Sequence, residues 1–143
     1  MKAVLDVGQF VSATIVPGGH PAKILSGWRV GTFELVTSIP ILNDLRRVLH
    51  YPHIRKRHRW TDEEIDLFVD SLALAASVTA GDLEVDAVED DPSDNKVLAC
   101  AVEARADYVV ASDEHLSKLG TFSGIPIVAP RRFLEILNEM SPA

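Results

Sequence analysis

Short β-branched runs alternate along this chain with longer segments whose apolar residues recur at helical spacing. The runs LVTSI, YVVAS and PIVAP are bounded by Gly, Pro or charged residues, which is typical of buried strands. Other segments follow the helical period, such as Ile65, Phe68, Val69, Leu72 and Ala76. This order favours an α/β fold in which a central, mostly parallel sheet is covered by helices.

Local signals predict about five strands and about six or seven helices. Ser38 followed by Pro40 indicates a helix start, because the hydroxyl caps free backbone N–H groups and proline fits the first turn. Thr61 and Glu64 form a capping box before a long helix. We expect strands near residues 2–6, 33–37, 83–87, 107–111 and 126–129, and helices near 21–28, 38–50, 61–77, 94–105, 114–119 and from 130 onward.

Length and composition suit one compact core. The chain has 143 residues, of which 47% are hydrophobic, so we expect residues 1–143 to form a single domain. Cys100 is the lone cysteine and is expected to pack as a small core residue. The opening MKAVLD carries an acid at its sixth position and no later apolar run approaches a membrane-spanning length. We therefore expect a cytoplasmic protein that does not contact membranes.

Charge is unevenly distributed in this acidic chain. The net charge of -7 argues against a protein that coats nucleic acid with its whole surface. Residues 46–59 nevertheless hold six of the fourteen Lys and Arg, and residues 82–94 hold seven of the 21 acids. The two segments fit a phosphate-attracting rim beside an acidic metal pocket, or equally well two solvated faces.

Four aspartates lie where strands are expected to stop or helices to start: Asp6, Asp44, Asp94 and Asp113. In open parallel sheets, the loops and helix N-termini that follow the strands converge at one edge. Carboxylates gathered there would repel one another unless a cation neutralised them. The sequence therefore predicts a divalent metal site.

Carboxylates are the ligands that the hard ions Mg²⁺ and Mn²⁺ prefer, and a phosphodiester is the natural substrate of a site that holds these ions. Such ions lower the pKa of a bound water and offset the charge that develops on phosphate, so no serine, cysteine or histidine nucleophile is needed. The alternative interpretation is a small-molecule or ion-binding α/β domain in which the acids are helix caps around a lone ion site.

Four blocks of the chain together resemble a PIN domain: MKAVLDVGQFVSA, SIPILNDLRRVL, DPSDNKVLACAVEARADYVVASDEHL and IPIVAPRRFLEIL. The similarity is greatest to the VapC-like toxins of type II toxin–antitoxin systems. It implies a three-layer α/β/α sandwich and a metal-dependent endoribonuclease, usually a homodimer inhibited by an antitoxin. The acids of the family's site match Asp6, Asp44, Asp94 and Asp113, with Asp91 auxiliary.

The chain departs from the family pattern at its first motif, which usually reads Asp-Thr-Asn but here reads Asp6-Val7-Gly8. The helix acid is more often glutamate than aspartate. Ala111 stands where a hydroxyl is frequent, and Ser112 is the candidate substitute. Fewer supporting groups around the metal ligands favour weak activity, or a degenerate PIN domain that binds RNA or a protein partner without cleaving.

Arginines next to the helix acid are candidates for contact with the substrate. Arg46 and Arg47 follow Asp44 by two and three positions, which suits contact with the phosphates of an RNA substrate. The basic residues at 55–59 could serve RNA, the antitoxin or a second copy of the chain, and the sequence leaves these three roles open.

Overall fold

The computed structural model describes residues 1–88 and 91–140. These residues form six strands and eight helices. The strands are β1 (Lys2–Leu5), β2 (Glu34–Ser38), β3 (Ser77–Thr79), β4 (Tyr108–Val110), β5 (Thr121–Phe122) and β6 (Ile125–Val128). The helices are α1 (Val7–Ile15), α2 (His20–Arg29), α3 (Ile39–Leu49), α4 (Pro52–His58), α5 (Asp62–Ala75), α6 (Pro92–Ala104), α7 (Glu114–Leu119) and α8 (Pro130–Met140).

The strands form one sheet in the order β3-β2-β1-β4-β6-β5. All pairs are parallel except β5 with β6, which are antiparallel. The predicted α/β fold with a mostly parallel sheet is therefore confirmed, and the sheet has six strands in place of the expected five, since neither β3 nor β5 lies in an expected strand. Because β1, β2, β3 and β4 run in the same direction, the segments that follow them start at a common edge.

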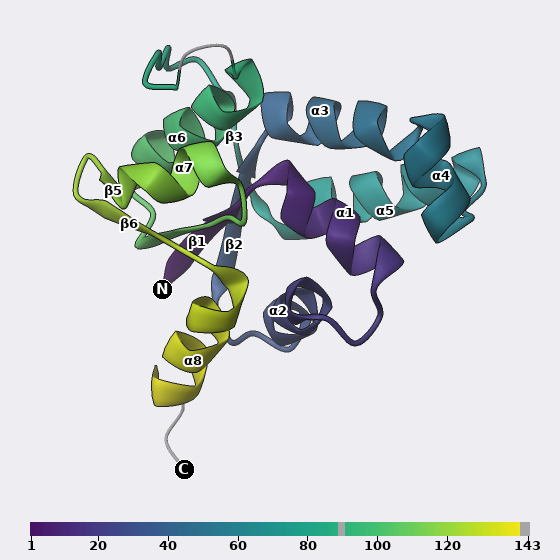
Figure 1. Cartoon of the computed structure of the whole chain (residues 1–143), viewed down its shortest axis with the longest axis horizontal. Helices are drawn as coiled ribbons and strands as arrows, with labels where there is room; N and C mark the ends of the chain where they lie inside the picture. Colours follow the sequence, from purple (N-terminus) through teal and green to yellow (C-terminus); the bar gives the residue numbers. More distant parts are fainter. Residues whose placement is uncertain (89–90, 141–143) are drawn as a thin grey trace.

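Helices cover both sides of the sheet. Figure 1 shows α6 and α7 on one side of the strands and α1, α3 and α5 on the other. The apolar face of α6 buries Val97, Leu98 and Ala101 against the sheet, and Cys100 is fully buried beside them. Burial raises the pKa of the Cys100 thiol to about 11, as expected of a packed core residue. Across the described ranges, no helix combines the length and apolar character needed to traverse a bilayer.

Helix starts follow the local signals in the sequence. Ser38 caps α3 by accepting a hydrogen bond from the Ile41 N–H at 3.3 Å. Thr61 and Glu64 form the predicted capping box of α5. Such caps satisfy N–H groups that the first turn of a helix leaves without partners. The boundaries of these helices were therefore predictable from neighbouring residues alone.

The strand expected at residues 83–87 is wrong, because this segment is an irregular loop and the third strand is β3, earlier in the chain. Side chains of α6 satisfy the backbone of the loop. Glu103 accepts hydrogen bonds from the N–H groups of Asp82 and Leu83, at 3.0 and 3.2 Å. Asn95 accepts from Ala87 and Val88 and donates to the Val88 carbonyl. The alternation of apolar and acidic residues in this segment resembles that of a strand, but its backbone groups bond to side chains of α6 instead of to a neighbouring strand.

Two helices were not predicted from the sequence. Helix α1 begins directly after Asp6 and contains Val7 and Gly8, which are weak helix formers. Helix α4 begins at Pro52, just after the expected end of the helix at residues 38–50. Proline does end α3, yet the same residue fits the first position of a new helix, where its missing N–H is not needed.

Gly81 fixes the loop after β3 against the start of α3. Its φ is +80°, and a Cβ built there would lie 2.5 Å from Cδ and Cγ of Pro40. We expect Gly81→Ala to lower the free energy of unfolding by roughly 2–4 kcal/mol, from the left-handed backbone and the clash together. Urea denaturation measures this loss.

Gly31 provides the matched control, because its φ is +88° but nothing lies within 4 Å of its added Cβ. Gly31→Ala is expected to lower the free energy of unfolding by the cost of the left-handed backbone alone, on the order of 1 kcal/mol. Equal losses in the two variants would show that the contact between Gly81 and Pro40 is not tight.

Candidate metal centre

A cavity of about 530 Å³ opens at the sheet edge where the parallel strands end. Its polar lining includes Ser12, Ser93 and Ser112. It also contains the carboxylates of all four aspartates singled out from the sequence together with the auxiliary one: Asp6, Asp44, Asp91, Asp94 and Asp113. No Lys or Arg belongs to the lining of this cavity among the residues that the structure describes.

Three of these acids cap helices whose N-termini meet at the cavity. Asp6 accepts from the Gln9 N–H of α1 at 3.0 Å, and Asp113 accepts from two N–H groups of α7. Asp91 accepts from the Asp94 N–H at the start of α6 at 3.2 Å. Each of these hydrogen bonds uses a single carboxylate oxygen, Oδ1, so capping leaves the other oxygen for a cation. The capping and metal-binding interpretations are therefore compatible.

Asp94 differs from the capping acids. It lies inside the first turn of α6, where Asp91 is the N-cap, so the suggestion that Asp94 itself serves as the cap is wrong. Its side chain is 5% exposed, and Oδ2 is buried without a hydrogen-bond partner. Such an atom destabilises a fold unless another group satisfies it. Among the described residues, the fold therefore buries a carboxylate oxygen that no N–H or hydroxyl donor satisfies.

Burial and neighbouring acids favour the protonated form of Asp94. Desolvation raises its pKa to about 8, and hydrogen bonds with Asp91 and Asp113 and the negative charges of those two acids add to the effect. Burial likewise raises the pKa of Asp6 to about 6, with a smaller contribution from the charge of Asp113, against the lowering effect of the Gln9 N–H. Two acids with raised pKa values in the lining of one cavity indicate a strongly negative site.

The geometry of the cluster suits a hard cation. One carboxylate oxygen each from Asp91, Asp94 and Asp113 lies within 4.8 Å of the others. Oxygens on opposite sides of an octahedral Mg²⁺ are about 4.2 Å apart, since each bond is about 2.1 Å. The three carboxylates, one of which carries the unpartnered Oδ2 of Asp94, are thus the kind of donor that Mg²⁺ or Mn²⁺ prefers. The residues present fit such an ion.

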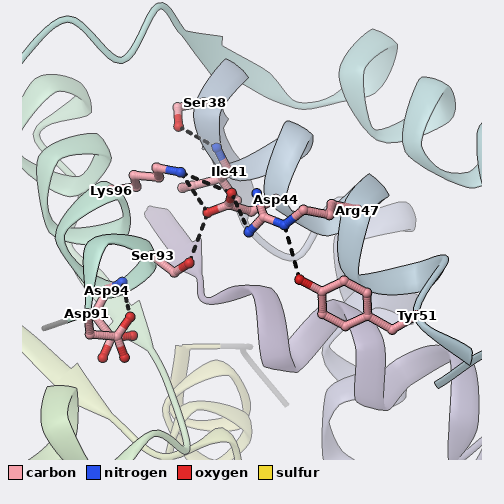
Figure 2. Close-up of polar contacts among 9 residues, drawn as sticks. All are labelled: Ser38, Ile41, Asp44, Arg47, Tyr51, Asp91, Ser93, Asp94 and Lys96. Atoms are coloured by element: carbon pink, nitrogen blue, oxygen red, sulfur yellow. Dashed lines mark hydrogen bonds and ion pairs between the residues drawn. The ribbon is translucent and has the colours of Figure 1, made fainter. Parts of the chain in front are cut away.

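Asp44 lies in the same cavity but is engaged with other residues. Its side chain is 2% exposed. Figure 2 shows Lys96 from α6 and Arg47 from α3 meeting at this carboxylate, with Asp91 and Asp94 beside one another at the start of α6. Lys96 Nζ lies 3.0 Å from Oδ1 and 3.1 Å from Oδ2, Arg47 Nη2 lies 3.0 Å from Oδ1, and the Ser93 hydroxyl donates to Oδ2 at 3.1 Å.

These four contacts equal the number of lone-pair positions that a carboxylate offers. Asp44 can therefore reach a metal ion only by giving up one of them. Aspartate stands here in place of the family's more frequent glutamate, and protein groups are the partners of both its oxygens.

Four polar residues at this site were not predicted from the sequence: Gln9, Ser12, Ser93 and Lys96. Ser93 and Lys96 are three positions apart, so they share one face of α6, and this spacing was the available signal. Gln9 is 2% exposed and donates from Nε2 to the Ser112 hydroxyl at 3.0 Å. The contact joins α1 to the segment just before Asp113, which gives the predicted auxiliary residue Ser112 a neighbour in the cavity.

The two arginines proposed to bind substrate differ in their surroundings. Arg46 pairs with Asp66 and, at 2.8 Å, with Asp70, so acids of α5 already neutralise it. Arg47 is 55% exposed and donates from Nε to the Tyr51 hydroxyl while it contacts Asp44. These positions leave Arg47 the better placed of the two for a phosphate.

The mostly parallel sheet, flanked by helices and carrying a carboxylate cluster at its edge, defines an α/β protein with a nuclease-type fold and a site able to bind metal. The family model of the PIN domain matches residues 2–115, and the chain belongs to this family. A comparison with curated proteins gives no match. PIN domains are in general metal-dependent nucleases, which agrees with the acidic site described above.

Proposed function

We propose that this chain is an endoribonuclease that hydrolyses RNA phosphodiester bonds with Mg²⁺ or Mn²⁺ as cofactor. Asp91, Asp94 and Asp113 would hold the ion, and Asp6 would complete the acidic wall beside them. Asp44, which the family resemblance also marks as a ligand, would support the site through its hydrogen bond from Ser93, the residue before Asp94.

The observation that carries the proposal is the state of Asp94. Its buried Oδ2 has no partner, and its pKa is raised to about 8 among two further carboxylates. Natural folds seldom keep a buried polar atom without a hydrogen-bond partner unless it has a functional role. A divalent ion would satisfy that oxygen and cancel the repulsion among the three acids.

A bound Mg²⁺ or Mn²⁺ supplies Lewis-acid stabilisation of charge on the phosphate and lowers the pKa of water. The chain's own residues prepare the site for that ion. Helix N-termini hold Asp6, Asp91 and Asp113 in fixed orientations through backbone N–H groups. In the absence of an ion, Asp94 keeps a proton near neutral pH, and it releases this proton when a cation takes its place.

Titration of the purified chain with Mn²⁺ by isothermal calorimetry tests the site. We expect saturable binding in the micromolar to millimolar range, accompanied by proton release near pH 7 because Asp94 must ionise. Incubation with mixed RNAs should yield fragments with Mn²⁺ or Mg²⁺ and none with EDTA. Absence of saturable Mn²⁺ binding would contradict the proposal.

A degenerate PIN domain is the second candidate, favoured by Val7 and Gly8 in the cavity lining where the family usually carries a hydroxyl and an amide. Saturable Mn²⁺ binding without cleavage of any RNA would favour this function. Cleavage that requires the ion would exclude it.

We propose further that the chain is the toxin of a toxin–antitoxin pair, acting in the cytoplasm as a homodimer that a partner antitoxin inhibits. The similarity of four sequence blocks to VapC-like toxins supports this role. Growth arrest on induced expression, relieved by co-expression of a small protein encoded beside this chain, would be the expected result. Light scattering measures the oligomeric state.

A further inference from the structure

The acidic cavity presents an electrostatic problem for the proposed substrate. Five carboxylates line it, and no described Lys or Arg does. An RNA strand carries a negative charge at every nucleotide, and a metal ion neutralises only the phosphate that it contacts. The neighbouring phosphates of the strand need cations from the protein.

Lys96 is the described lysine that contacts an acid of this cavity, through its ion pair with Asp44. Its side chain is 37% exposed, whereas that of Asp44 is 2% exposed, so the pair presents its positive partner to solvent. An ammonium has three N–H donors, and the two contacts with Asp44 occupy at most two of them. At least one donor remains for a ligand.

The place of Lys96 between two cavities indicates where such a ligand would lie. Lys96 is the one cation among the described residues that line a second cavity of about 610 Å³, whose other charged lining residues are the acids Glu84, Asp86 and Asp91. Asp91 lines both this cavity and the acidic cavity of about 530 Å³ at the sheet edge. A strand with its scissile phosphate at the metal cluster would therefore pass Lys96 as it enters the second cavity.

The buried partner explains why this lysine is well suited to bind a phosphate. Asp44 carries one negative charge, and Lys96 and Arg47 together carry two positive charges, so the three residues have a net charge of +1. Contacts with both oxygens of a buried carboxylate hold the ammonium in one position, which lowers the entropy that it loses on binding.

We propose that Lys96, anchored on Asp44, binds the RNA phosphate next to the scissile one at the junction of the two cavities. This inference rests on the proposed ribonuclease function and adds a substrate-binding residue to it. Asp44 then acts as a positioning residue for Lys96.

The test measures binding of a fluorescent single-stranded RNA by anisotropy in EDTA, where metal-dependent cleavage does not occur, over a series of salt concentrations. Lys96→Met is expected to weaken binding several-fold at low salt and to reduce the slope of log affinity against log salt by about 0.7, the value for one phosphate contact on a single strand. Lys96→Arg should keep the wild-type slope, since it keeps the charge.

Arg131→Met is the matched control, because it removes one positive charge from α8 at a side chain that is 80% exposed. It should leave the RNA affinity and its salt slope unchanged. The Mn²⁺ affinity of Lys96→Met should stay within about threefold of wild type, since Lys96 contacts none of the three clustered acids.

An unchanged salt slope in Lys96→Met would overturn the inference, and so would absence of RNA binding by the wild-type chain in EDTA. Loss of Mn²⁺ binding in Lys96→Met would also overturn it, because Lys96 would then only support the acids. Failure of the wild-type chain to bind Mn²⁺ is a separate result that concerns the proposed ribonuclease function, so the two failures are distinguishable.

Discussion

Replacement of Asp94 by asparagine is expected to weaken Mn²⁺ binding by at least about a hundredfold and to abolish RNA cleavage. Loss of residues that only orient metal ligands already costs about ten- to a hundredfold, and Asp94 supplies a carboxylate of the cluster itself. Isothermal calorimetry measures the affinity, and gel analysis of RNA fragments measures cleavage.

The same substitution should stabilise the chain without metal at pH 8. Asparagine has nearly the same shape and can donate hydrogen bonds toward Asp91 and Asp113, whereas ionised Asp94 repels both. Asp82→Asn is the control, because this exposed residue lines neither cavity. Retention of wild-type Mn²⁺ affinity by Asp94→Asn would remove Asp94 from the metal site.

The stability of the metal-free chain is expected to fall as pH rises from about 4 to about 8. The pKa of Asp94 is raised from 3.8 to about 8, and that of Asp6 from 3.8 to about 6. Between those values, each group keeps its proton in the folded chain and loses it in the unfolded chain. The folded state then binds more protons than the unfolded state. The contribution of each acid to the free energy of unfolding is therefore complete below about pH 4 and is lost as pH rises through the pKa of that acid in the folded chain.

Excess Mn²⁺ should reverse this trend above about pH 6, because the ion binds the ionised carboxylates and competes with protons for them. Urea unfolding at a series of pH values, with EDTA or with Mn²⁺, measures both slopes. The difference between wild type and Asp94→Asn isolates the part due to Asp94, since other carboxylates titrate in both proteins. If the difference in the free energy of unfolding between the two proteins does not vary between pH 5 and 8, the raised pKa of Asp94 would be contradicted.

The fold was largely predictable because its signals are local. Ser38 and the Thr61 capping box act on the N–H groups of their own helices, and buried β-branched runs mark the parallel strands. The prediction failed where side chains distant in sequence decide the conformation of the backbone. The loop that contains Leu83 resembles a strand in its alternation, but Glu103 and Asn95 of α6 take up its backbone groups.

The candidate site was predictable in part for the same reason. Asp6 and Asp113 follow parallel strands, so the topology alone brings them to one edge of the sheet. Asp91 was ranked as auxiliary because Pro92 separates it from Asp94. In the structure, Pro92 begins α6 and Asp91 caps it, and this geometry places both carboxylates together with that of Asp113 in the cluster that could hold a metal ion.

By itself, the sequence determined the alternating α/β order and the gathering of aspartates at strand ends, since helix period, strand burial and capping depend on neighbouring residues. Only the tertiary structure decided how those aspartates divide their roles. Asp44 meets Ser93 and Lys96 across 49 and 52 positions of the chain. Partners so distant are selected by the packing of α3 against α6, which turns one acid into an anchor for cations and leaves Asp94 with an oxygen free for a metal ion.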